Sequence, residues 1–95
     1  MSRNEKANVL VVDDELDNLR LLSLLLKRGG LVPRPLTNGK KAIETALAEP
    51  PDLVLLDIQM PEMSGFEVCQ RFMQDERLQA IPIIFISGRQ GTDDK

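Results

Sequence analysis

The feature that most limits the fold of this chain is a regular alternation of short apolar runs with amphipathic segments. The apolar runs cover residues 8–14, 31–36, 52–57 and 81–87, and the amphipathic segments between them cover 15–27, 40–48 and 66–74. Strands that alternate with helices through short connections form a parallel sheet, with right-handed crossovers and helices on both faces. The sequence therefore predicts one α/β domain over residues 1–95.

The apolar positions also predict where each element lies. The run 31–36 contains two prolines, which cannot donate hydrogen bonds to a neighbouring strand, so we expect it at an edge of the sheet. In the first helix the spacing of the leucines predicts a broad buried face made of Leu16, Leu19, Leu21, Leu22, Leu24, Leu25 and Leu26. In the third helix we expect Phe66, Cys69, Phe72 and Met73 to point inward.

The composition excludes several classes of function. The chain has no histidine and one cysteine, so it contains no imidazole base, no Cys–His dyad and no internal disulfide. We expect Cys69 to be a reduced, packed thiol. A net charge of −3, with only three aromatic residues, disfavours direct nucleic-acid binding. No apolar run reaches the roughly 20 residues that span a bilayer, and the polar N-terminus is unlike a signal peptide, so a cytoplasmic location is expected.

Polar residues with chemical potential follow three of the predicted strands. The first strand ends in Asp13 and Asp14, the third in Asp57, and the fourth in Ser87 and Gly88. Parallel strands point the same way, and ligands of such sheets bind beyond the carboxyl ends of the strands. We therefore expect three carboxylates and one hydroxyl around a single crevice. Each residue alone also fits an ordinary role as a strand end, helix cap or turn residue.

Three neighbouring carboxylates repel one another unless protons or a cation lie among them. An all-oxygen site suits Mg²⁺, which is usually held by one or two carboxylates, waters and a phosphate oxygen. The loop after Asp57 places the backbone carbonyl of Gln59 as a further ligand. An aspartate beside Mg²⁺ can attack phosphorus and form an aspartyl-phosphate, to which the Ser87 hydroxyl would donate a hydrogen bond.

These residues resemble the receiver domain of two-component response regulators. The resemblance rests on "VLVVDDE", "NLRLL", "TNGKKAIE", "PDLVLLDIQMPEMSGFEV" and "IPIIFISG", which follow in order along almost the whole chain. It implies a flavodoxin-like, doubly wound sheet of strand order 2-1-3-4. The chain stops at "GTDDK", where the family's fourth helix begins. By this resemblance the fourth helix, fifth strand and fifth helix are expected to be missing, and residues 1–95 form a C-terminally incomplete receiver domain.

The resemblance also implies a role for each site residue. Asp57 matches the phosphoacceptor, Asp13 and Asp14 match the acidic pair that binds Mg²⁺ with Asp57 and the Gln59 carbonyl, and Ser87 matches the switch hydroxyl. Gly88 stands where the family has a small residue, and no lysine of this chain matches the family's catalytic lysine. The implied partners are a histidine kinase or phosphotransfer protein, and an output domain beyond residue 95. Such a module is not an enzyme beyond self-phosphorylation and autodephosphorylation.

Two further hypotheses follow. Without a fifth strand, the apolar fourth strand has an exposed edge, so we expect the chain either to be a fragment of a longer product or to self-associate, for example through this edge. The alternative function is accordingly a receiver-like interaction or dimerisation module that does not switch. A haloacid-dehalogenase-type phosphatase is disfavoured, because its acids follow an Asp-x-Asp pattern, whereas Asp13 and Asp14 are adjacent.

Overall fold

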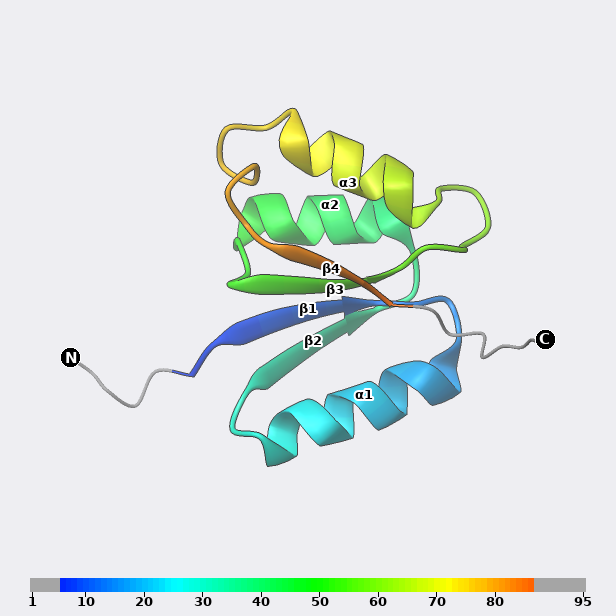
Figure 1. Cartoon of the computed structure of the whole chain (residues 1–95), viewed down its shortest axis with the longest axis vertical. Helices are drawn as coiled ribbons and strands as arrows, with labels where there is room; N and C mark the ends of the chain where they lie inside the picture. The colour runs from blue at the N-terminus through cyan, green and yellow to red at the C-terminus, as the bar shows by residue number, and fades with distance from the viewer. Residues whose placement is uncertain (1–5, 87–95) are drawn as a thin grey trace.

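A parallel sheet with helices on both faces makes up the architecture of the chain (Figure 1). The computed structural model describes residues 6–86. Its elements, in order, are β1 (Asn8–Val12), α1 (Leu16–Arg28), β2 (Val32–Leu36), α2 (Gly39–Ala48), β3 (Leu53–Asp57), α3 (Gly65–Met73) and β4 (Ile83–Ile86). The strands are ordered β2-β1-β3-β4, which confirms the predicted sheet.

The two middle strands are buried because layers cover both of their faces. In β1, Leu10 and Val12 face α2 and α3, whereas Val9 and Val11 face α1. Each of these four side chains is almost completely buried. The proline-containing strand β2 pairs with β1 alone among the described strands, so its predicted edge position is confirmed.

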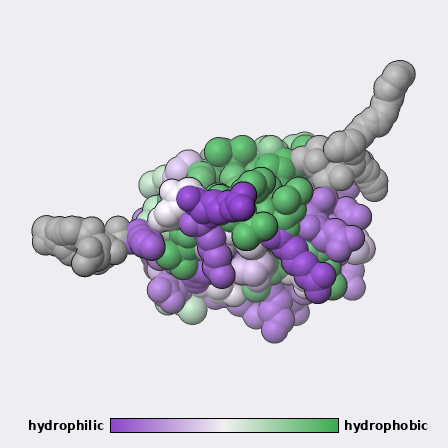
Figure 2. Space-filling view, turned by 90° about the horizontal axis from the view of Figure 1, so that it is seen from below, coloured by the Kyte–Doolittle hydropathy of each residue, from purple (hydrophilic) through white to green (hydrophobic). Residues whose placement is uncertain are grey.

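The predicted broad buried face of α1 is wrong. Leu19 is buried, and Leu22 and Leu26 are partly buried against β1 and β3. The other four leucines of the predicted face are more than half exposed: Leu16, Leu21, Leu24 and Leu25. Within residues 6–86, α1 is the one helix on its side of the sheet (Figure 1), so only a narrow stripe of it finds a partner. Figure 2 shows the hydrophobic surface on this side of the molecule.

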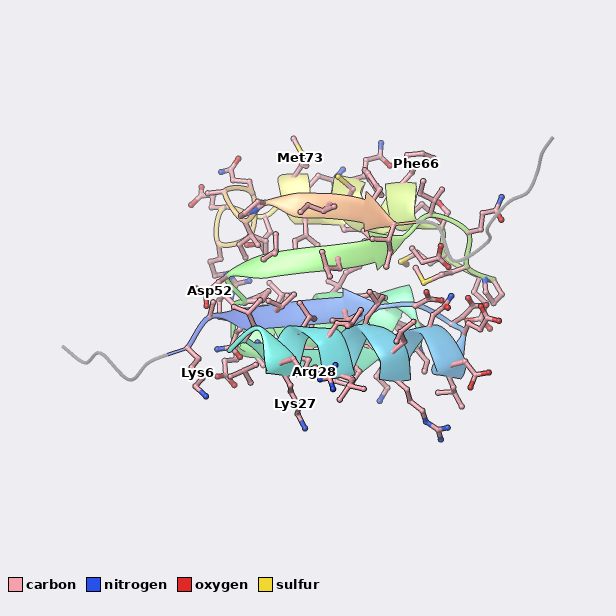
Figure 3. The ribbon with its side chains drawn as sticks, turned by 60° about the horizontal axis from the view of Figure 1, so that its bottom comes forward. Lys6, Lys27, Arg28, Asp52, Phe66 and Met73 are labelled. Atoms are coloured by element: carbon pink, nitrogen blue, oxygen red, sulfur yellow. The ribbon has the colours of Figure 1, made fainter. Side chains whose placement is uncertain are left out.

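The predicted inward face of α3 is right for Phe72 and wrong for two residues. Val68 and Phe72 are buried against the core, and Cys69 is half-buried. Phe66 and Met73, labelled in Figure 3, are 59% and 62% exposed rather than inward. The Phe66 ring packs against Phe85 of β4 instead, with ring centroids 5.2 Å apart.

Local hydrogen bonds define the helix ends and one turn. The Asn38 side chain accepts a hydrogen bond from the Lys41 N–H, which caps α2. At the start of α3, Ser64 and Glu67 form a reciprocal capping box. After α3, the backbone and side chain of Arg77 donate to the Asp75 carboxylate. These hydrogen bonds lower the pKa of the Asp75 carboxyl below its ordinary value.

The strand boundaries matter for the site that follows. The predicted strand 8–14 ends at Val12, so Asp13 and Asp14 lie in the connection to α1. Ser87 and Gly88, predicted at the end of the fourth strand, lie outside the described residues. No helix within residues 6–86 is long and apolar enough to cross a bilayer.

Candidate functional site: an acidic cluster at the carboxyl edge of the sheet

Asp57 is the last residue of β3 and is 6% exposed. The apolar residues before it form a buried strand between β1 and β4. This strand places the Asp57 carboxylate at the end of the sheet where the carboxyl ends of the parallel strands lie. Two residues later, the Gln59 N–H donates a long hydrogen bond of 3.4 Å to Asp57 Oδ1. The loop after β3 therefore folds back over the carboxylate that it follows.

Asp13 follows β1 directly and is 1% exposed, whereas Asp14 is exposed. The Asp13 N–H extends the sheet by donating to the carbonyl of Leu36, 3.1 Å away. Its side-chain Oδ1 accepts the Glu15 N–H at 2.9 Å. Asp13 therefore links the end of β1 to the first turn of α1: its backbone N–H bonds to β2, and its carboxylate accepts from the start of α1.

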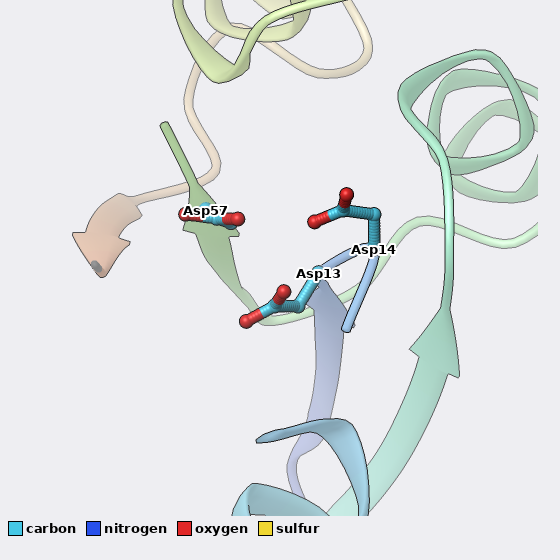
Figure 4. Close-up of side chains that lie close together, drawn as sticks. All are labelled: Asp13, Asp14 and Asp57. Carbon is cyan, nitrogen blue, oxygen red and sulfur yellow. The ribbon is translucent and has the colours of Figure 1, made fainter. Parts of the chain in front are cut away.

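The structure brings Asp13, Asp14 and Asp57 together, although they lie far apart in the sequence. One carboxylate oxygen from each residue lies within 4.8 Å of the others (Figure 4). Two of the three carboxylates are buried, where a negative charge is costly unless it is compensated. Gln59 contacts this cluster as well, because its backbone N–H donates to Asp57 Oδ1.

The chemistry of the donor set fits a hard divalent cation. Three carboxylates supply oxygen ligands only, which Mg²⁺ prefers over the nitrogen and sulfur ligands that softer metals take. Asp14, the exposed member, leaves the cluster open to solvent on one side. An open side is needed for the waters and phosphate oxygen that complete an Mg²⁺ shell.

The loop between β3 and α3 contains a strained turn. The Met63 N–H donates to the Pro61 carbonyl at 2.7 Å, and the residue between them, Glu62, has a φ of 70°. This is a γ-turn with a positive φ at its centre, a rare and strained conformation for a residue with a Cβ atom. Glycine adopts a positive φ without that cost.

Glu62→Gly is therefore expected to stabilise the protein by about 0.5–1 kcal/mol, because removal of the strain outweighs the added freedom of the unfolded chain. The measurement is urea unfolding followed by circular dichroism. Glu62→Ala is the matched control, because it removes the charge but keeps the strained φ. Equal stability of the glycine and alanine variants would contradict the prediction.

Two further residues border the cluster: Asn18, which sequence reasoning missed, and Gly65, which the sequence already indicated as shaping the loop after Asp57. Asn18, on α1, donates to Asp13 Oδ2 at 3.4 Å and to Glu15 Oε1 at 2.9 Å. Gly65, the first residue of α3, donates its N–H to the Ile58 carbonyl at 2.9 Å. The position of Asn18, one helical turn after Glu15, is the signal that could have shown its approach to the cluster.

Comparison with known proteins places this geometry in a family. A family model described as "Response regulator receiver domain" matches residues 9–95. The chain belongs to this family. Receiver domains are the phosphoacceptor modules of two-component signalling, and the acidic cluster lies at the edge of the sheet where the resemblance placed the phosphoacceptor site.

Individual relatives support the assignment. The receiver chain is 36% identical to the response regulator PleD of Caulobacter vibrioides over 89 residues, which are 94% of this chain and 20% of that protein. It is 36% identical to the polar-differentiation response regulator DivK of Brucella anthropi over 80 residues, which are 84% of this chain and 65% of that protein. The chain thus spans from about a fifth to about two thirds of the length of these relatives.

The solved structures agree. The crystal structure of the N-terminal domain of a response regulator receiver protein from Methanoculleus marisnigri superposes with a TM-score of 0.85 at 35% identity. That match covers 93% of this chain and 72% of the other. The receiver fold is therefore shown by sequence and by structure.

Proposed function

We propose that this receiver chain accepts a phosphoryl group on Asp57 from the phosphohistidine of a histidine kinase or phosphotransfer protein. The observation that carries the proposal is the meeting of three carboxylate oxygens within 4.8 Å at the end of β3. Asp57 is proposed as the acceptor because this last residue of β3 matches the phosphoacceptor position of the family, whereas Asp13 and Asp14 match its metal-binding acidic pair. Asp13 and Asp14 hold Mg²⁺ together with Asp57 and the backbone carbonyl of Gln59.

The transfer balances without any further reactant. A carboxylate oxygen of Asp57 forms a bond to phosphorus while the bond between phosphorus and the donor imidazole nitrogen breaks. The electron pair of the broken bond returns to the imidazole, which then takes a proton. Mg²⁺, held by the carboxylates, would neutralise the negative charge of the phosphoryl oxygens and of the neighbouring carboxylates. The residues of this chain position the acceptor, and the donor protein supplies the activated phosphoryl group.

The switching step rests on the family resemblance. Ser87 would donate a hydrogen bond to the phosphoryl group, Gly88 would leave room for it, and a partner or an output domain beyond residue 95 would read the change. In this proposal residues 1–95 act as one receiver unit in the cytoplasm, with no catalytic lysine of their own.

A small-molecule phosphodonor tests the proposal without a cognate kinase. The chain is incubated with acetyl phosphate and Mg²⁺ and its intact mass is measured. We expect one phosphate per chain, removed by hydroxylamine as an acyl phosphate is, and absent when EDTA removes the metal. If no metal-dependent phosphate adduct forms, the proposal is contradicted, and the non-switching interaction module described next is favoured.

The second candidate function is an interaction module that associates without switching. Within the described chain β4 pairs with β3 alone, and its residues Ile84 and Phe85 are 50% and 37% exposed. An apolar strand with an unpaired edge is a template for pairing with further β-structure. We propose that a second copy supplies this structure when the 95-residue chain is alone in solution.

Ile84→Lys is expected to weaken this self-association by at least about tenfold, because a charge on an edge strand opposes edge-to-edge pairing. Sedimentation velocity over a concentration series measures the effect. Val32→Lys is the matched control, since Val32 is an exposed apolar residue on the opposite edge strand β2. A wild-type chain that sediments as a monomer at every concentration would refute the proposed association.

A further inference from the structure

The side chain of Asn18 lies against the acidic cluster from the α1 side. Its Nδ2 is 3.4 Å from Asp13 Oδ2 and 2.9 Å from Glu15 Oε1. Both neighbours are carboxylates, which only accept hydrogen bonds when they are ionised, so the amide must turn its NH₂ group toward them. One half-buried amide thus donates to two acids at the edge of the site.

With the Asn18 contact, each carboxylate oxygen of Asp13 has a hydrogen-bond donor. The Glu15 N–H donates to Oδ1 at 2.9 Å, and the Asn18 amide donates to Oδ2. Both donors belong to the start of α1, so the helix fixes the orientation of a carboxylate that belongs to the end of β1. The 3.4 Å contact is long for a hydrogen bond, so the bond from Asn18 is the weaker of the two and the Asn18 side chain is the donor with more room to move.

We propose that Asn18 is a positioning residue that sets the affinity of the cluster for a divalent cation. The proposal rests on the function proposed above and adds to it a residue that is not itself a metal ligand. By donating to Asp13 it keeps that carboxylate oriented toward Asp14 and Asp57 when no cation is bound. Its second hydrogen bond holds the Glu15 side chain on the helix, so that this fourth carboxylate does not enter the cluster.

The energetic reason is preorganisation. Three like charges within 4.8 Å turn away from one another unless they are held, and the cation must then overcome that reorientation. Groups that hydrogen-bond a metal ligand usually contribute about 10- to 100-fold to metal affinity. Because the bond to Asp13 is long, we expect an effect at the lower end, about tenfold.

The test measures binding of Mn²⁺ to the chain by the electron paramagnetic resonance signal of the free ion. This probe is needed because the chain has no tryptophan and no tyrosine to report binding by fluorescence. The main variant is Asn18→Leu, which has a similar volume and no donor, and Asn18→Ala repeats the loss with a smaller side chain. Glu15→Gln is the matched control, because its side-chain oxygen still accepts the Asn18 hydrogen bond.

We expect both Asn18 variants to bind Mn²⁺ about tenfold more weakly, while the Glu15→Gln variant stays within about threefold of wild type. The thermal midpoint in EDTA measures separately what the two Asn18 hydrogen bonds contribute without metal, and this contribution is expected to be small because one bond is exposed and the other only partly buried. Unchanged Mn²⁺ affinity of both Asn18 variants would overturn the inference, as would a lower midpoint in EDTA with the affinity intact. If wild type itself fails to bind Mn²⁺, the proposed function fails together with this inference.

Discussion

Asp57→Asn is expected to abolish phosphate incorporation from acetyl phosphate. The substitution keeps the shape of the side chain but replaces an anionic oxygen nucleophile with a neutral amide, which does not displace a phosphoryl group at a useful rate. It also removes one of the three carboxylates that gather at the site. The measurement is intact mass after incubation with acetyl phosphate and Mg²⁺, with peptide mapping to confirm the position.

The matched control is Asp52→Asn, at the opposite end of the same strand. Asp52 comes just before β3, is exposed, and accepts the Asn8 N–H at 2.7 Å, at the start of the strand that Asp57 ends (Figure 3). Both variants lose one negative charge, so the overall charge cannot explain a difference between them. We expect the Asp52 variant to incorporate phosphate as wild type does. Phosphate that persists in the Asp57 variant would assign the acceptor to another residue.

The layout of the sheet could be predicted because it depends on features within short segments. Two prolines were enough to place residues 31–36 at an edge, and β2 lies there. The convergence of Asp13, Asp14 and Asp57 followed from one geometric rule, since parallel strands carry their last residues to the same edge.

The burial of the helices could not be predicted in the same way. Leucine spacing shows which side of α1 is apolar, but burial also requires a second layer to cover that side. Leu21 and Leu25 meet no such layer in the described part of the chain and are more than half exposed. Phe66 likewise has helical spacing that fits the core, yet its ring lies against Phe85 across the edge of the sheet. Whether these side chains are buried depends on which elements pack against them, and the spacing of apolar residues along one helix carries no information about those elements.

Gly65→Ala is expected to destabilise the protein by about 3 kcal/mol, at the upper end of the range for overpacking. A Cβ atom on Gly65 would overlap the backbone carbonyl oxygen of Asp57 and lie 2.9 Å from the Cα atom of Ile58. Both are backbone atoms held by the hydrogen bonds of β3 and its loop, so they cannot move aside as a flexible side chain would. The start of α3 would have to shift away from the strand, breaking the hydrogen bond from the Gly65 N–H to the Ile58 carbonyl.

Thermal unfolding followed by circular dichroism measures this effect, and a loss of about 3 kcal/mol lowers the midpoint by more than about 10 °C in a domain of this size. Gly29→Ala is the matched control at the end of α1, where a Cβ would meet only carbonyl oxygens at ordinary distances of 3.5 and 3.7 Å. A Gly65 variant as stable as the Gly29 variant would contradict the close approach of α3 to β3. Because a shift of α3 also pulls on the loop that leads into it, whose Gln59 N–H donates to the Asp57 carboxylate, the same variant should also accept phosphate more slowly. The packing of α3 and the position of the acceptor carboxylate are therefore expected to change together.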